Sequence, residues 1–341
     1  MAKRRRPTMK DVAERAGVSL STVSYVVNKS GPVADDRRAR VLDAIRILNY
    51  TPNESARSLR RRFASTIGLV VPDLANQYFA LVAEGVGRAA SDRGVLVVLC
   101  VPQATGKSDE FYAELLRSQR LDGVVYLSAT GTMPSALLEL SSSGVVVLVD
   151  EQMPGFPLPS VVSDNRRGAS EIARYVIEAG HKRIAMIGGP APLWSAEQRL
   201  AGYREALAAA GHNPDEVPLL NGDYRQQSGY EMAAEALAGD AGQRPTALIC
   251  ANDLMALGAL EYCKSAGISV PEDVSIVGFD DVPTAALVTP RLTTVRQHAS
   301  DLGIAAADLL FELIDDESEA RQPKPFATTL MMRDSVAPPK A

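Results

Sequence analysis

The sequence predicts two kinds of fold in one chain: a small all-α domain at the N-terminus, followed by an α/β body of two doubly wound parallel sheets. The chain has 341 residues, which exceeds one typical domain. Apolar residues recur at helical spacing up to about residue 50, whereas from Thr66 onward short apolar runs alternate with helical stretches. Residues 1–62 hold 15 Lys and Arg against 6 Asp and Glu, while the remainder holds 21 against 35. The N-terminal part therefore has a net charge of +9, and the body has −14. We expect the N-terminal part to bind a polyanion, and we expect no such binding by the body.

The composition excludes several classes of protein. With 46% hydrophobic and 23% charged residues the chain is typical of a globular protein, and it has no apolar run of about 18 residues that could span a membrane. The N-terminal segment MAKRRRPTMK carries charge but no following apolar stretch, so we expect no secretory signal. Cys100, Cys250 and Cys263 lie far apart without metal-ligand spacing, which predicts buried thiols and no metal site.

The first predicted helix runs from Met9 to Ala16. Thr8 and Asp11 have the spacing of a capping box, and Gly17 stands where a left-handed residue ends a helix. Ser19 can cap a second helix from Leu20 to about Asn28. A third helix, from about Ala34 to Leu48, would cover the open side of the first two. This arrangement of cap, glycine turn and inward valines predicts a helix-turn-helix unit.

The outer face of the second helix has the chemistry of a DNA-reading surface. Short polar side chains can bind phosphates and fix the register, and larger side chains near the helix start can reach base edges. An ordinary three-helix bundle with a polar face is the alternative, but the basic surroundings favour DNA. The predicted DNA-binding residues of this domain are Thr8, Ser19, Leu20, Ser21, Thr22, Tyr25 and Asn28.

The segment after the third helix reads as a hinge. Pro52 breaks the helix, and residues 54–62 form a basic stretch too short to hold as an isolated helix in water. We expect this stretch to fold only on binding. Its one large apolar residue, Leu59, lies among four arginines, which suits a wedge inserted between base steps in the minor groove.

The body contains two successive series of buried-strand patterns separated by helical stretches such as 78–93. The first series is TIGLVVP, VLVVLC, DGVVYL and VVVLVD, and the second is RIAMIGG, TALICAND and VSIVGFDD. Such runs are typical of parallel strands buried on both faces. Two tandem doubly wound units predict a bilobed ligand-binding body.

Polar residues follow the predicted strands, where open α/β sheets bind ligands. Asp150, Asn252 and Asp280 each follow a strand, and Arg199 stands in a helix after a Gly-Gly-Pro loop. Carboxylates and amides accept hydrogen bonds from hydroxyls, and arginine offers a rigid fork of donors. The aromatic faces expected beside them are Tyr78, Phe79, Trp194 and Tyr224. Asp253 directly follows Asn252, and Asp281 directly follows Asp280. Both are interpreted instead as helix caps.

Three segments, MKDVAERAGVSLSTVSYVVN, NYTPNESARSLR and STIGLVVPDLANQYF, together resemble the LacI/GalR (lactose-repressor) family over essentially the whole chain. The resemblance implies a cytoplasmic, nucleoid-associated transcriptional regulator, a repressor, that binds a pseudo-palindromic operator as a homodimer and responds to a small-molecule effector. It implies a body like the type I periplasmic binding proteins. The implied boundaries are a DNA-binding domain at 1–50, a hinge at 51–63, and a body at 64–341 with an N-lobe (64–162, 294–320) and a C-lobe (163–293, 321–341).

Residue roles also follow from the resemblance. It implies a minor-groove role for Leu59 and a close approach at Ala56. Many members carry Arg where this chain has Tyr25, and tyrosine cannot make the bidentate guanine contact, so the operator preference at that position departs from theirs. The effector contacts implied or supported by the resemblance are Tyr78, Phe79, Asp150, Ser195, Arg199, Tyr224, Asn252, Asp280 and Gln297.

Several alternatives remain at this point. Matches at Ser195 and Gln297 favour a sugar effector, whereas the Tyr78–Phe79 pair resembles purine-responsive members. An NAD-dependent oxidoreductase is disfavoured, because the G-x-G-x-x-A pattern from Gly85 lies inside a helix and not at a strand-to-helix turn. A transported-solute receptor would need an export signal. We therefore expect no enzyme activity and no cofactor.

The expected oligomer is a dimer and not a tetramer. Two linked heads gain specificity through a high effective concentration, and the hinge helix needs a partner. The C-terminal sequence MMRDSVAPPKA contains Pro338 and Pro339 and no apolar heptad, so it predicts no helical bundle there. We expect the pairing surface on the body, along helices such as 78–93 and 300–313.

Overall fold

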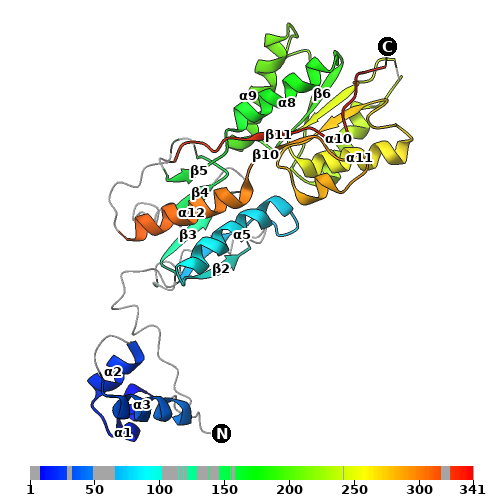
Figure 1. Ribbon diagram of the computed structural model, residues 1–341. Helices are drawn as coiled ribbons and strands as arrows, with labels where there is room; N and C mark the ends of the chain where they lie inside the picture. The colour runs from blue at the N-terminus through cyan, green and yellow to red at the C-terminus, as the bar shows by residue number, and fades with distance from the viewer. Residues whose placement is uncertain are drawn as a thin grey trace. The chain divides into compact units, whose positions relative to one another are not determined.

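The computed structural model describes residues 8–28, 33–48, 66–101, 121–128, 146–153, 158–240, 242–315 and 323–340, together with the single residues 114, 118, 138 and 155. The chain divides into two compact units, Met1–Arg62 and Phe63–Ala341 (Figure 1). We call the first unit the head and the second the body. No helix in the described ranges is both long and apolar enough to cross a bilayer.

The head consists of three helices, α1 (Met9–Ala16), α2 (Leu20–Asn28) and α3 (Asp35–Leu48). Thr8 Oγ1 accepts the backbone N–H of Asp11, and Asp11 Oδ2 accepts the backbone N–H of Thr8 at 2.7 Å, which is the predicted capping box. Gly17 ends α1 in the left-handed conformation with φ +64°. The helix-turn-helix prediction is confirmed in both its elements and its caps.

The head closes around a small core in which valine and alanine predominate. Its buried members are Val12, Ala13, Ala16, Val23, Val26, Val41 and Ala44. Small side chains let the three short helices approach closely, and they leave the polar residues of α2 outside. The core therefore orients the face of α2 on which the DNA-reading prediction rests.

The first sheet of the body has five parallel strands in the order β2-β1-β3-β4-β5. The strands are β1 (Thr66–Val70), β2 (Leu96–Cys100), β3 (Gly123–Tyr126), β4 (Val146–Val149) and β5 (Ser160–Val161). The first four coincide with the predicted apolar runs, whereas the two-residue β5 has no run of its own. Burial differs from expectation at β2, where Leu96, Val98 and Leu99 are exposed because this strand forms the edge of the sheet.

Helices α5 (Gln77–Asp92) and α12 (Ala299–Ile314) pack against each other on this sheet (Figure 1). A Cβ at Gly85 would lie 2.0 Å from the Ser300 carbonyl oxygen, and one at Gly303 would lie 2.1 Å from that of Val82. Glycine is therefore required at both crossing points. Gly87 has no neighbour within 4 Å, so the G-x-G pattern in α5 reflects helix packing at Gly85 alone.

The second sheet has four parallel strands in the order β7-β6-β8-β9. They are β6 (Ile184–Gly188), β7 (Leu219–Asn221), β8 (Ala247–Cys250) and β9 (Ser275–Val277). Helix α8 (Asn165–Glu178) packs with α9 (Trp194–Ala209), and α10 (Gln226–Ala236) packs with α11 (Asp253–Ala266). We call the first sheet with α5 and α12 the N-lobe, and the second sheet with α8–α11 the C-lobe.

In the described part of the chain, three segments lie where the lobes join. Residues after β5 enter the C-lobe, where Ser163 forms a parallel bridge with Phe326. Strands β10 (Thr294–Arg296) and β11 (Thr329–Met331) pair antiparallel beside it. The described C-terminal residues return to the C-lobe, where the Ser335 carbonyl accepts the N–H of Ile276. Helix α12 thus completes the N-lobe although it follows the whole C-lobe in sequence.

The three cysteines are free and buried, as expected from their spacing. Burial raises the pKa of the Cys100 thiol to about 11 and that of Cys263 to about 12. These thiols therefore behave as small apolar side chains of the core and not as nucleophiles.

Candidate functional site

The N-terminal end of α2 presents the head's polar face. Ser19 Oγ accepts the N–H of Thr22 at 3.2 Å, so Ser19 caps the helix. The hydroxyls of Ser21 and Thr22 lie 2.8 Å and 2.9 Å from Ser19 Oγ. Leu20 and Tyr25 are 53% and 47% exposed. This face therefore offers hydroxyls and two large side chains to a partner, as the predicted DNA contacts require.

The structure leaves some predicted DNA contacts without a description. Ala56 and Leu59 lie outside the described residues, and so does the side chain of Asn28. Their roles stay predictions from the sequence and its family resemblance.

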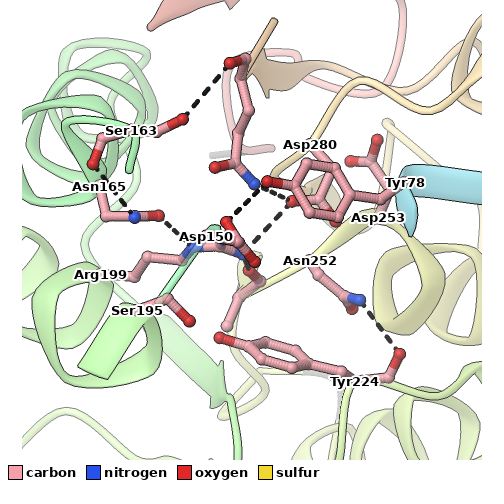
Figure 2. A network of polar contacts seen from close by, with 12 residues as sticks. Tyr78, Asp150, Ser163, Asn165, Ser195, Arg199, Tyr224, Asn252, Asp253 and Asp280 are labelled. Atoms are coloured by element: carbon pink, nitrogen blue, oxygen red, sulfur yellow. Dashed lines mark hydrogen bonds and ion pairs between the residues drawn. The ribbon is translucent and has the colours of Figure 1, made fainter. Parts of the chain in front are cut away.

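In the body, polar side chains gather where the carboxyl ends of both sheets meet (Figure 2). Asp150 follows β4, Asn252 follows β8, and Asp280 follows β9. Tyr78 comes from α5 and Arg199 from α9. We call the whole group the inter-lobe cluster, and its members are Tyr78, Asp150, Glu151, Ser195, Arg199, Tyr224, Asn252, Asp280 and Gln297.

The N-lobe contributes a buried tyrosine–aspartate pair to the cluster. Tyr78 donates its hydroxyl proton to Asp150 Oδ1 at 2.6 Å, and Tyr78 is only 2% exposed. Burial raises the pKa of Asp150, and the Arg199 charge and the Tyr78 hydrogen bond oppose that shift. Phe79 meets Tyr78 edge to face at 5.8 Å and packs against the N-lobe core. Tyr78 therefore orients Asp150, and its hydroxyl is already occupied.

Arg199 is the centre of the C-lobe half. Its Nε donates to Asn165 Oδ1 at 2.8 Å, and its Nη1 donates to the Ala251 carbonyl at 2.6 Å and to Asp280 Oδ1 at 3.4 Å. The guanidinium carbon lies 4.1 Å from the Phe279 ring centroid and 5.6 Å from that of Tyr224. Arginine alone supplies this fork of planar donors together with a stacking face.

Asp280 shares its Oδ1 between Arg199 and Gln297, whose Nε2 donates to it at 2.6 Å. Burial raises the pKa of Asp280 to about 7, although Arg199 acts to lower it. The Oε1 of Gln297 and the hydroxyl of Tyr224 are buried without a hydrogen-bond partner. Buried polar groups of this kind are costly unless a ligand or a water satisfies them, which makes both atoms candidate ligand contacts.

Backbone strain concentrates in the same cluster. Asp150, Tyr224 and Asp280 have positive φ values of 72°, 67° and 117°. Non-glycine residues adopt this region at a cost, and such residues gather at functional sites where the surrounding structure holds them. Three of the five non-glycine residues with positive φ in the described chain are thus predicted effector contacts; the other two are Asp281 and His298.

Sequence reasoning missed Glu151, the residue that links the two lobes here. Glu151 is 2% exposed, accepts the Ser195 N–H at 3.2 Å through Oε2, and accepts the Ser195 hydroxyl through Oε1. Burial raises its pKa to about 8, and the neighbouring Asp150 adds to the shift. Ser195 is thus in the cluster as predicted, but its hydroxyl is engaged by the opposite lobe. The only signal for this role in the sequence is that a second acidic residue, Glu151 itself, directly follows Asp150.

Other predicted residues have structural partners. Asn252 caps α11, since its Oδ1 accepts the Met255 N–H at 2.9 Å, and its Nδ2 donates to the Tyr224 carbonyl at 3.0 Å. It therefore fixes the loop that carries Tyr224. Asp253 and Asp281, interpreted as caps, have other partners: Asp253 accepts from Val282 N and Thr294 Oγ1, and Asp281 pairs with Arg296 and Arg333.

A DNA-reading head and a two-lobed body with a polar cluster between its lobes define a DNA-binding transcriptional regulator. Residues 8–53 match the bacterial regulatory proteins of the lacI family, and residues 173–336 match the periplasmic binding protein-like domain. This chain belongs to the lacI family of bacterial regulatory proteins and is a DNA-binding repressor of that family.

Relatives and solved structures match nearly the full length of this chain. An HTH-type transcriptional repressor PurR of Pasteurella multocida (strain Pm70) is 36% identical over 96% of this chain and 98% of its own length. The transcriptional regulator CelR–cellobiose complex is 35% identical, with TM-score 0.70, over 97% of this chain and 100% of that chain. The lac repressor dimer bound to operator and the anti-inducer ONPF is 28% identical, with TM-score 0.84, over 98% and 100%.

Proposed function

We propose that a small-molecule effector, a sugar or sugar derivative, binds at the inter-lobe cluster and controls the affinity of the head for its operator. The observation that carries this proposal is the network of Arg199, Asp280 and Gln297, in which Gln297 Oε1 has no partner; the hydroxyl of Tyr224, in the same cluster, has none either. A polyhydroxylated ligand supplies both donors and acceptors to such atoms. The solved CelR structure holds cellobiose, which supports the same class of ligand for this chain.

A purine or nucleoside is the second candidate effector. It is favoured by the names of PurR relatives and by the adjacent aromatics Tyr78 and Phe79. The geometry weighs against Tyr78 as an open stacking face, because it is buried and its hydroxyl is bonded to Asp150. Arg199, Tyr224 and Asp280 serve either ligand class.

The effector test uses the only tryptophan of the chain, Trp194, which is half-buried at the start of α9. Its fluorescence is titrated with cellobiose, glucose and ribose, and separately with adenine and guanine. Saturable change with a sugar, together with a raised unfolding temperature, supports the proposal, since bound ligand at about 100 times Kd adds ~2.7 kcal/mol to stability. Saturation by a purine alone would replace the sugar by the second candidate.

DNA binding by the head is proposed to involve a near-palindromic operator read by two heads. The contacts assigned to α2 and its cap are Ser19, Leu20, Ser21, Thr22 and Tyr25. Operator affinity should fall with salt at a log–log slope of roughly −0.9 per neutralised phosphate. A flat salt response, or protection of one asymmetric half-site in footprinting, would contradict this arrangement.

The second head comes from a second copy of the chain. The lac repressor structure is a dimer, and β2 exposes Leu96, Val98 and Leu99 at the edge of the N-lobe sheet. Helices α5 and α12, which the sequence favoured for pairing, pack against each other, and among these three elements the exposed large apolar side chains lie on β2. We assign the partner's contact to β2.

The remaining assignments follow from this role. A DNA-binding repressor acts in the cytoplasm, in contact with the nucleoid, and its ligand is bound and released unchanged. The inter-lobe cluster is therefore assigned no catalytic residue. Incubation with the effector identified above, followed by recovery of the intact compound, tests the absence of turnover.

A further inference from the structure

Helix α9 begins in the C-lobe without a side-chain cap from its own lobe. Its N-cap residue, Leu193, makes no side-chain hydrogen bond. The second residue of the helix, Ser195, donates its backbone N–H to Glu151 Oε2 at 3.2 Å and its hydroxyl proton to Oε1. The free N–H groups at a helix start need acceptors, and the carboxyl oxygens of Glu151 supply them here. A residue of the N-lobe thus caps a helix of the C-lobe.

A second contact joins the lobes elsewhere. Gln77, the first residue of α5, donates from Nε2 to Thr284 Oγ1 at 2.6 Å, and its Oε1 accepts the Thr284 N–H at 3.2 Å. Thr284 lies in the short 3-10 helix η1 (Pro283–Ala286) of the C-lobe. The two contacts share no residue, so they report independently on whether the lobes are together.

Burying Glu151 in these surroundings costs folding free energy. It is 2% exposed, and the charges that face it are Asp150, which repels it, and Arg199, which attracts it. Ser195 supplies both of its hydrogen bonds, and the buried Tyr224 lies within its field. Burying a carboxyl group beside a second one costs folding free energy, and groups perturbed in this way are candidates for a functional role.

We propose that Glu151 is a positioning residue for the regulatory response: by capping α9 from the opposite lobe, it holds the two lobes in the closed arrangement and fixes Ser195 within the inter-lobe cluster. An effector then acts on a two-state element whose closed form this cap stabilises. The proposal rests on the proposed function for its regulatory meaning, but closure is measured here without effector or DNA.

Hydrogen exchange of the full-length protein tests the cap and the closure together. Glu151→Ala is expected to speed exchange at the start of α9, residues 194–197, about fivefold, the factor that corresponds to one lost helix cap. It is also expected to speed exchange of the Thr284 N–H, which Glu151 does not touch, because open lobes break the Gln77 contact too. Trp194 emission should shift to the red, and acrylamide should quench it more strongly.

Two variants complete the design. Glu151→Gln keeps an acceptor for the Ser195 N–H and should restore most protection at both places, which also serves if Glu151→Ala does not fold. Gln152→Ala alters the next residue, which bonds to Ser160 of its own lobe at 3.4 Å, and should leave exchange unchanged. Faster exchange at α9 alone, with Thr284 unaffected, would show a local cap and overturn the proposal, as would unchanged exchange at both places.

The outcomes separate this proposal from the effector assignment. If no sugar or purine binds but the exchange pattern appears, the closing role of Glu151 stands and the effector assignment fails. If an effector binds normally to Glu151→Ala and its lobes exchange like those of the parent, the closing role fails and the effector assignment stands.

Discussion

Replacing Arg199 by methionine should destabilise the body far more than a surface arginine would. Arg199 is 2% exposed and is the cation that faces the buried carboxylates of Asp280 and Asp150. Methionine keeps an unbranched apolar side chain but removes the charge and the three hydrogen bonds to Asn165, Ala251 and Asp280. Breaking a buried ion pair by removing one partner costs about 3–5 kcal/mol, a large share of a stability of about 5–15 kcal/mol.

The loss of folding stability in Arg199→Met should depend on pH. Burial raises the pKa of Asp280 to about 7 against the lowering effect of Arg199, so without Arg199 that pKa rises further. The folded state then holds a proton that the unfolded state releases, and stability falls as pH rises between the ordinary aspartate pKa and the raised one. The destabilisation should therefore be full at about pH 8.5 and should shrink towards pH 5.

Urea unfolding followed by Trp194 fluorescence measures this effect within the body. Arg166→Met, which removes an exposed arginine paired with Glu205, should leave the transition where it is. Asp280→Asn in the Arg199→Met background should recover a substantial part of the loss, because it removes the uncompensated carboxylate. An equal loss at both pH values, without recovery in the double variant, would refute the electrostatic reasoning. Arg199→Ala should abolish the effector response while operator binding persists, and this stability readout must accompany that assay, because the same substitution removes a buried charge.

Three further outcomes are expected. Leu59→Ala should weaken specific operator binding and reduce DNA bending while leaving non-specific binding nearly intact, and equal bending in a circular-permutation assay would exclude the wedge. Burial and Asp150 raise the pKa of Glu151 to about 8, so the folded parent holds a proton that the unfolded chain releases, and its stability falls as pH rises from about 4.5 to about 8. Glu151→Gln should flatten this fall. An unchanged dependence of the unfolding free energy on pH, measured by urea titrations, would place the proton on another group. Light scattering should give twice the 36.4 kDa chain mass, and Leu96→Asp in the exposed β2 patch should yield monomers, whereas a tetramer would reveal another interface.

The sequence predicted those parts of the fold that carry a local periodic signal. Buried runs marked β1, β4 and β8, and helical spacing with caps marked the head to within a residue. Strands β5, β7, β10 and β11 span only two or three residues, and unlike the three-residue β9 they do not lie in one of the predicted apolar runs. Exposure of β2 was missed because an apolar run carries no information about which strand stands at a sheet edge.

The site shows the same division between local and non-local information. Strand ends located Asp150 and Asp280, since the carboxyl edge of a parallel sheet is where ligands meet polar residues. In a sequence, an asparagine before a helix has the same pattern whether its side chain caps the helix or binds a ligand. The structure shows that Asn252 caps α11. Glu151 could not be assigned, because its partner lies on the other lobe, 44 residues onward.

The late position of α12 in the chain has a consequence for synthesis on the ribosome. The helix covers β3 and β4, and a Cβ on Gly123 would come 2.8 Å from Leu310 Cδ1, so sheet and helix are in direct contact. Because domains form as their residues emerge, the head can complete its fold early while the N-lobe sheet stays uncovered until residues 299–314 leave the exit tunnel. Stalled nascent chains ending before Ala299 should therefore contain a protease-resistant head and a digestible N-lobe, and resistance of both would show that the sheet folds without its helix. A nascent chain of this protein thus becomes competent to touch DNA before it becomes competent to be regulated.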